Sequence, residues 1–122
     1  MCIRDRFEAS EEAPGAPGLG VLRGEVKRLT PAEGVKIPHM GWNQLEVRRD
    51  SPILSGVPRD AGVYFVHGYH VTPQDETIVA TTTDYGRPFV SSIWNDNVMA
   101  TQFHPEKSQK VGLRMLANFA AL

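Results

Sequence analysis

Several features that would define a class of protein are scarce in this sequence. Its 122 residues include a single cysteine, which excludes an internal disulfide framework and fits a reducing, cytoplasmic compartment. Lysine and arginine number 13 against 14 aspartates and glutamates, so we expect no nucleic-acid partner and no membrane partner. No apolar run reaches the roughly 18 residues of a membrane span, and the first residues lack the apolar stretch of a signal peptide.

Three common functional motifs are missing as well. The chain has no Gly-x-Ser-x-Gly elbow, no Gly-x-Gly-x-x-Gly turn and no phosphate-binding loop, so serine hydrolysis and nucleotide binding have no motif to support them. The composition is otherwise that of a globular domain, with 41% hydrophobic and 22% charged residues. A chain of this size can form a core, while 11 glycines and 9 prolines predict many turns between short elements.

The hydrophobic pattern predicts short strands followed by one helix. A short helix is expected at 5–12, ended by the prolines and glycines of 13–18. Strands are expected at 19–22, 25–29, 37–47 (with a bend at Gly41), 63–67, 78–83, 89–94 and 98–103. This pattern favours a sheet-rich α+β protein, and it also fits the last strand and helix of an α/β fold.

The final segment is the helix with the firmest pattern. Ser108 is a residue type that caps helices, and Val111, Met115, Leu116 and Phe119 recur at spacings of three and four. Leu113, Ala117 and Ala120 widen the apolar side, so we expect the helix to pack against a sheet.

The segment between the last strand and this helix carries the sharpest chemical signal. His104 and Glu106 lie two residues apart with Pro105 between them. A carboxylate next to an imidazole can select one tautomer, orient the ring and stabilise its charged form, as in a nucleophilic triad. Loops at the carboxyl ends of strands are also where open α/β sheets bind ligands. The alternative is a histidine and a glutamate on an ordinary surface loop.

The other histidines allow two further interpretations. His39 precedes Trp42 in a Pro-His-Met-Gly-Trp-Asn run, which is either a functional element or a structural turn with a core tryptophan. His39, His67, His70 and His104 together raise the hypothesis of a zinc site. That hypothesis is weakened because no Cys pair and no His-Glu-x-x-His pattern supports it, and we predict no metal and no cofactor.

The order and spacing of these segments resemble the class I, or triad, glutamine amidotransferases. His-Pro-Glu alone indicates the broad class, and the run at 38–43 resembles the glutaminase subunits that serve histidine biosynthesis. The likeness extends over residues 7–122. It rests on Phe7-Glu8-Ala9-Ser10-Glu11-Glu12, Pro17-Gly18-Leu19-Gly20-Val21-Leu22, Pro38-His39-Met40-Gly41-Trp42-Asn43, Tyr64-Phe65-Val66-His67-Gly68-Tyr69, Thr83-Asp84-Tyr85-Gly86 and Thr101-Gln102-Phe103-His104-Pro105-Glu106-Lys107-Ser108.

The resemblance implies a fold and a reaction. The fold is α/β, the carboxyl-terminal portion of a flavodoxin-like open sheet flanked by helices. In the reaction His104 would be the general base and Glu106 its orienting carboxylate, activating a cysteine thiolate that attacks the side-chain amide of L-glutamine. Glu12, Gly68 and Tyr69 match positions that border the bound glutamine.

The resemblance also implies a partner. In this subfamily the glutaminase forms a heterodimer with a cyclase subunit, a (β/α)8 barrel, to which the ammonia passes without release to solvent. His39, Trp42, Tyr64 and Lys107 match the face turned toward that barrel.

The sequence departs from the family at its beginning. The family nucleophile has the pattern Gly-x-Cys-x-Gly-Met-Gln, whereas Cys2 has neither the glycines nor the Gly-Met-Gln. We therefore expect 1–6 to be a non-matching end and 7–122 to be a partial domain without the first strands and the nucleophile elbow, inactive alone. Two alternatives stay open: a non-catalytic, partner-binding domain of this type, and an amidotransferase of another biosynthetic pathway.

Overall fold

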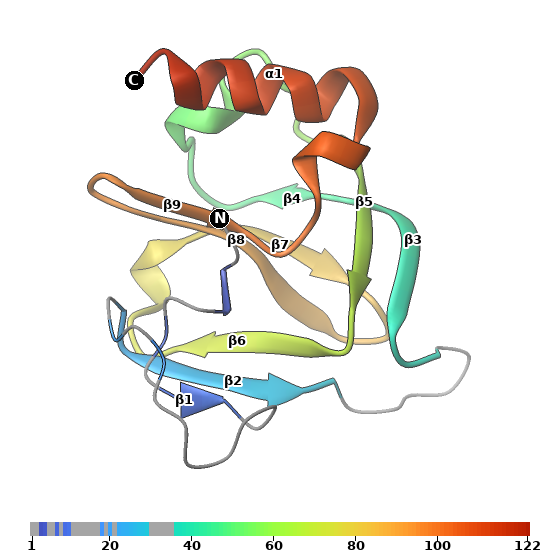
Figure 1. Cartoon of the computed structure of the whole chain (residues 1–122), viewed down its shortest axis with the longest axis vertical. Helices are drawn as coiled ribbons and strands as arrows, with labels where there is room; N and C mark the ends of the chain where they lie inside the picture. The colour runs from blue at the N-terminus through green and yellow to red at the C-terminus, as the bar shows by residue number, and fades with distance from the viewer. Residues whose placement is uncertain are drawn as a thin grey trace.

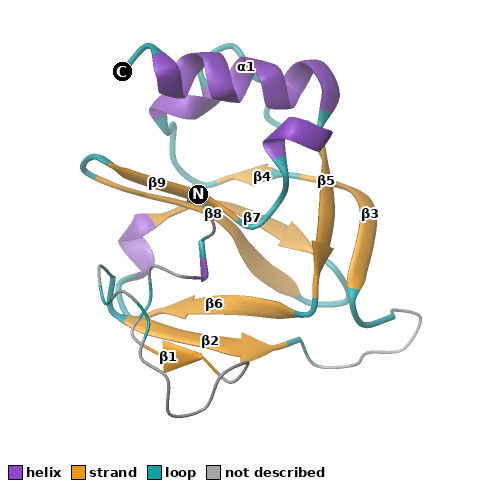
Figure 2. Ribbon diagram, in the orientation of Figure 1, coloured by secondary structure: helices purple, strands orange, loops and turns teal. Residues whose placement is uncertain are grey.

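Three small sheets and one α-helix form the described part of the protein. The computed structural model describes residues 3–4, 7, 9–10, 18, 20, 22–29 and 36–122. The α-helix lies along one end of the molecule, a three-stranded sheet lies at the other, and a two-stranded sheet connects these ends along one side (Figure 1). A four-stranded sheet fills the space between them (Figure 2).

Among the described residues, short strands and 3-10 turns follow one another along the chain before the single α-helix. The strands are β1 (Ala9–Ser10), β2 (Gly24–Arg28), β3 (His39–Gln44), β4 (Glu46–Val47), β5 (Gly62–His67), β6 (Tyr69–Pro73), β7 (Val79–Asp84), β8 (Pro88–Asn95) and β9 (Val98–Thr101). The helices are the 3-10 turns η2 (Pro52–Leu54), η3 (Glu76–Ile78) and η4 (Pro105–Lys107), and α1 (Gln109–Ala120). The sheets have the orders β1-β2-β6, β3-β5 and β4-β7-β8-β9, and only β1 and β2 pair in parallel.

The two-stranded sheet of β3 and β5, called the two-stranded wall below, has one exposed face and one buried face. His39 pairs with His67, and Trp42 pairs with Tyr64. Because side chains alternate along a strand, Met40 and Trp42 lie on the outer, exposed face while His39 lies on the inner, buried face. The inner face of β5 supplies buried Val63, Phe65 and His67.

Two hydrophobic clusters hold the sheets together. One joins β2, β6, η3, β8 and β9 through Ile3, Phe7, Leu22, Val26, Val71, Ile78, Ile93 and Ala100. The other joins β5, β8, η2 and α1 through Leu45, Ile53, Leu54, Val63, Phe65, Phe89, Phe103 and Met115. Ile3, which lies in the expected non-matching end at 1–6, is fully buried in the first cluster.

The expected strands at 25–29, 63–67, 78–83 and 89–94 are confirmed within one residue at each end. The helix expected at 5–12 is wrong where the structure describes it, because Ala9–Ser10 pairs with β2.

The segment around Gly41 also differs from expectation. Strand β3 continues through Gly41, whose φ of +119° lies in a region that favours glycine, and the break comes at Leu45 instead. Strand β6 was not among the strands expected from the sequence. It pairs with β2 along its whole length, and Tyr69, Val71 and Thr72 are residue types that favour strands.

Helix α1 is confirmed, with two corrections. Met115 is buried, whereas Leu113, Leu116 and Phe119 are 62%, 43% and 55% exposed, so only part of the apolar side packs. Ser108 stands at the N-cap position, but its hydroxyl makes no capping bond to the helix. Among the described residues no helix is long and apolar enough to cross a membrane.

Candidate active site

His104 and Glu106 form a close pair at the start of η4. Nδ1 of His104 lies 2.7 Å from Oε1 of Glu106, and the two side chains are 38% and 57% exposed. Because the carboxylate accepts a hydrogen bond at Nδ1, it fixes the tautomer in which Nε2 is free of hydrogen and can take up a proton. The pair therefore has the geometry of a general base with its orienting carboxylate.

The electrostatics of Glu106 suit that role. Its partial burial raises the pKa, but hydrogen bonds from its own backbone N–H and from the His104 ring, with the charges of His104 and Lys107, lower the pKa more. The net effect is a pKa below the ordinary value, so Glu106 is an anion near neutral pH.

The backbone of Tyr64 holds the segment that carries this pair. The His104 N–H donates to the Tyr64 carbonyl at 2.9 Å, and the Tyr64 N–H donates to Oγ of Ser108 at 3.0 Å. The Ser108 hydroxyl in turn donates to the His104 carbonyl at 2.6 Å. Gly112 allows α1 to pack against this turn, because a Cβ there would lie 1.7 Å from the Pro105 carbonyl oxygen.

Three of the four residues expected at a partner interface lie side by side on the outer face. The Trp42 and Tyr64 rings are 6.0 Å apart edge to face, and Nζ of Lys107 lies 5.9 Å from the Tyr64 ring centre. Trp42 is 53% exposed and neighbouring Met40 is 62% exposed. His39, the fourth, is only 2% exposed and lies beneath this face rather than on it.

The positions expected to border glutamine are partly described. Gly68 forms the turn from β5 to β6, and its carbonyl accepts the Leu29 N–H at 2.9 Å. The Tyr69 carbonyl lies 2.8 Å from Nδ1 of His67. Strand β5 thus connects the His104 segment, bonded at Tyr64, to the Gly68–Tyr69 turn at its end. Glu12 and Cys2 lie outside the described residues.

The histidines of the zinc hypothesis are separated by the fold. His39 and His67 contact each other, whereas His104 pairs with Glu106 on the segment that is bonded to Tyr64. Within the described ranges no group of three or more histidine, cysteine, aspartate or glutamate residues is placed to hold a metal ion.

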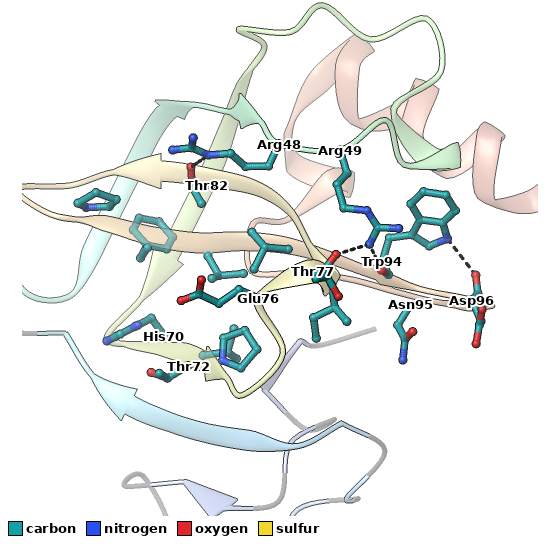
Figure 3. A pocket seen from close by; sticks show the side chains of 17 residues that line it. Arg48, Arg49, His70, Thr72, Glu76, Thr77, Thr82, Trp94, Asn95 and Asp96 are labelled. Carbon is teal, nitrogen blue, oxygen red and sulfur yellow. Dashed lines mark hydrogen bonds between the residues drawn. The ribbon is translucent and has the colours of Figure 1, made fainter.

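A hollow elsewhere in the protein was not expected from the sequence. It has a volume of about 1070 Å³ and is lined from β6, η3, β7 and β8, with Arg48 and Arg49 at its rim (Figure 3). The Arg49 guanidinium lies 4.5 Å from the Trp94 ring centre and donates to the carbonyls of Thr77 and Trp94 at 2.6 and 2.8 Å. These residues are up to 45 positions apart, so no local motif could have revealed them.

The family model that matches this chain is Glutamine amidotransferase class-I, over residues 16–121. A subunit HisH of imidazole glycerol phosphate synthase from Aquifex aeolicus is 59% identical over 113 residues, covering 93% of this chain and 54% of the relative. One from Syntrophotalea carbinolica is 52% identical over 118 residues, covering 93% of this chain and 57% of the relative. The chain thus spans about half the length of these curated relatives.

A solved structure shows the same fold. The glutaminase domain of CTPS from Trypanosoma brucei superposes with a TM-score of 0.61 at 17% identity, over 93% of this chain and 51% of that chain. The expected fold class is confirmed by this likeness and by the family match. The chain belongs to the class I glutamine amidotransferase family.

Proposed function

We propose that this chain is the carboxyl-terminal part of the glutaminase subunit of imidazole glycerol phosphate synthase, acting in the cytoplasm in histidine biosynthesis. The observation that supports it most is the 2.7 Å pair of His104 and Glu106 on the segment after β9. The curated relatives at 52% and 59% identity are named as that subunit.

The chemistry is acyl transfer from an amide. His104 takes the proton from a cysteine thiol, and the thiolate attacks the side-chain carbonyl carbon of glutamine. The tetrahedral intermediate collapses to a thioester as His104 returns a proton to the departing ammonia. Water, deprotonated by the same imidazole, then releases glutamate. Glu106 keeps the ring in the reactive tautomer throughout, and Glu12, Gly68 and Tyr69 border the substrate.

The thiol is not assigned to Cys2. A nucleophile of this type needs a tight strand-to-helix turn that exposes its sulfur beside backbone N–H groups for the oxyanion. Cys2 has no flanking glycines to form such a turn. We therefore expect the 122-residue chain alone to release no glutamate above background.

A chimera tests the catalytic assignment. Residues 16–121 of this chain would replace the matching stretch of the Aquifex aeolicus relative, which is 59% identical. With the cyclase subunit present, the chimera should hydrolyse glutamine. His104→Ala should reduce kcat by a factor on the order of 10⁴, and Glu106→Gln by less. Lys110→Ala, on the exposed side of α1, is the control. A folded chimera in which His104→Ala keeps full activity would refute the proposal.

The partner is the cyclase subunit, and the outer face of β3 and β5 is its docking surface. Exposed aromatic rings are typical of the anchors of protein interfaces. In the chimera, Trp42→Ala should weaken binding to the cyclase at least about tenfold, the scale of an aromatic anchor. His104→Ala should bind as the parent does. If the chimera binds the cyclase but never hydrolyses glutamine, the non-catalytic alternative is correct.

A further inference from the structure

A buried hydrogen-bond chain runs along the inner face of the two-stranded wall. Nδ2 of Asn43 lies 3.4 Å from Nε2 of His39, and Nδ1 of His39 lies 3.1 Å from Nε2 of His67. Nδ1 of His67 lies 2.8 Å from the Tyr69 carbonyl oxygen. These hydrogen bonds therefore connect β3, through His67 of β5, to the first residue of β6.

The groups at the two ends of this hydrogen-bond chain fix which ring nitrogen of each histidine carries hydrogen. A carbonyl can only accept, so Nδ1 of His67 carries hydrogen and donates to Tyr69. In a neutral ring Nε2 of His67 is then an acceptor, so Nδ1 of His39 carries hydrogen and donates to it. The Asn43 amide agrees, since its Nδ2 also donates to the Asp84 carbonyl at 2.9 Å.

The surroundings keep both rings neutral. His39 is stacked between the Tyr85 and Phe65 rings, with ring centres 3.8 and 4.8 Å away. His67 is 4% exposed and lies 4.9 Å from the Phe89 ring. Burial lowers the pKa of each imidazole to about 4. For His67 the hydrogen bond to the Tyr69 carbonyl raises the pKa, but burial outweighs it, and positive charge on His39, Arg4 or His70 lowers the pKa further. A second proton on either ring would also set two N–H groups against each other.

We propose that His39 and His67 are positioning residues, which as neutral rings in one fixed tautomer orient the Tyr69 carbonyl and the Gly68–Tyr69 turn beside the substrate. This rests on the proposed function, because only that proposal gives the turn a substrate. Neither ring touches the reacting atoms. His67 acts through its hydrogen bond to Tyr69, and His39 acts through His67.

The hydrogen-bond chain is tested first in the 122-residue chain, by nitrogen NMR of the histidine rings at pH 7. We expect a protonated Nδ1 and a bare Nε2 for both His39 and His67. Signals are assigned by their loss in His39→Asn and His67→Asn. A ring with hydrogen on Nε2, or a rapidly averaging ring, would overturn the proposal.

Two matched substitutions at His67 separate positioning from packing. Asparagine places its amide near the Nδ1 position and can still donate to Tyr69, whereas glutamine reaches the Nε2 position and cannot. We expect the carbonyl carbon-13 shift of Tyr69 to change in His67→Gln and to stay close to the parent value in His67→Asn. Equal changes in the two variants would mean that His67 only fills space. A second pair of variants applies the same test at His39, where asparagine keeps a donor and leucine does not. We expect the Tyr69 carbonyl shift to change in His39→Leu and to stay close to the parent value in His39→Asn.

The chimera then tests the role in the reaction. His67→Gln should raise KM for glutamine about tenfold, the effect of one lost hydrogen bond, with a smaller change in kcat. His67→Asn should recover most of that loss. If KM is the same in all His67 variants while His104→Ala is inactive, the positioning role is refuted and the proposed function stands. If His104→Ala is active, the proposed function fails whatever the NMR result.

Discussion

Tyr64 and His104 are joined by a backbone hydrogen bond of 2.9 Å, so one residue both presents an aromatic ring on the outer face and holds the candidate base. The Tyr64 N–H donates to the Ser108 hydroxyl on the same segment. The exposed aromatic face and the His104–Glu106 pair are therefore connected through the backbone of Tyr64. A displacement of β5 at Tyr64 would move His104 with it.

Replacing Ser108 by alanine should destabilise the protein through this connection. Ser108 is 1% exposed, and its hydroxyl accepts from the Tyr64 N–H and donates to the His104 carbonyl. Its loss leaves the Tyr64 N–H without its acceptor, whereas the His104 carbonyl keeps the Lys107 N–H at 3.1 Å. We expect a cost of about 2 kcal/mol in urea denaturation. Ser51→Ala is the matched control, because its buried hydroxyl has no hydrogen-bond partner. An equal cost at both positions would contradict the role of Ser108.

Replacing Gly112 by alanine should separate α1 from the His104 segment. The new Cβ would lie 1.7 Å from the Pro105 carbonyl oxygen and 2.9 Å from Cβ of Ser108, and backbone has to move to admit it. We expect a loss of about 3 kcal/mol, the upper range for overpacking, measured by thermal or urea unfolding. Gly62→Ala is the control, since a Cβ there meets nothing within 4 Å. A stable Gly112→Ala would show that the helix packs differently.

Stability should fall as the solution is acidified from pH 7 to pH 5. His39 and His67 have a pKa of about 4 in the fold and 6.5 in the unfolded chain, so only the unfolded chain gains protons in this range. At pH 5 this costs about 2 kcal/mol per histidine. Glu106 and Asp75, whose pKa values are lowered, lose their contribution only at more acidic pH.

Denaturation of the parent and of His39→Asn at the two pH values measures this effect. The variant lacks one of the two titrating rings, so its pH dependence should be about half that of the parent. A parent protein of constant stability from pH 7 to pH 5 would show that the two rings are not neutral and buried in solution.

Arg49 should matter for stability more than its neighbour Arg48. Arg49 donates to two backbone carbonyls, drawn as dashed lines in Figure 3, and its guanidinium lies over the Trp94 ring. The Arg48 side chain forms exposed contacts with Glu46 and Thr82. We expect about 2 kcal/mol from Arg49→Ala and less than about 0.5 kcal/mol from Arg48→Ala. Tryptophan fluorescence during urea unfolding reports both, and similar values for the two would contradict the assignment.

The sequence predicted much of the candidate site because its chemistry is local. His104 and Glu106 are two residues apart, and Pro105 restricts the backbone between them, so their meeting needs no distant contact. Strands such as β5 and β8 were predicted because β-branched and aromatic residues prefer a pleated, half-buried surface. The runs at 64–69 and 101–108 also carried the resemblance that the family match confirms.

Tertiary structure decided what depends on partners far along the chain. Strand β6, which was not expected from the sequence, pairs with β2, more than 40 positions earlier in the chain. Ser108 resembles a helix cap, but Tyr64, 44 positions away, uses its hydroxyl instead. His39 lies in the run that indicates an interface, yet pairing with β5 turns its ring inward onto His67, 28 positions away. Local propensity sets which conformations a segment can adopt, whereas burial and hydrogen bonding between distant segments select one of them.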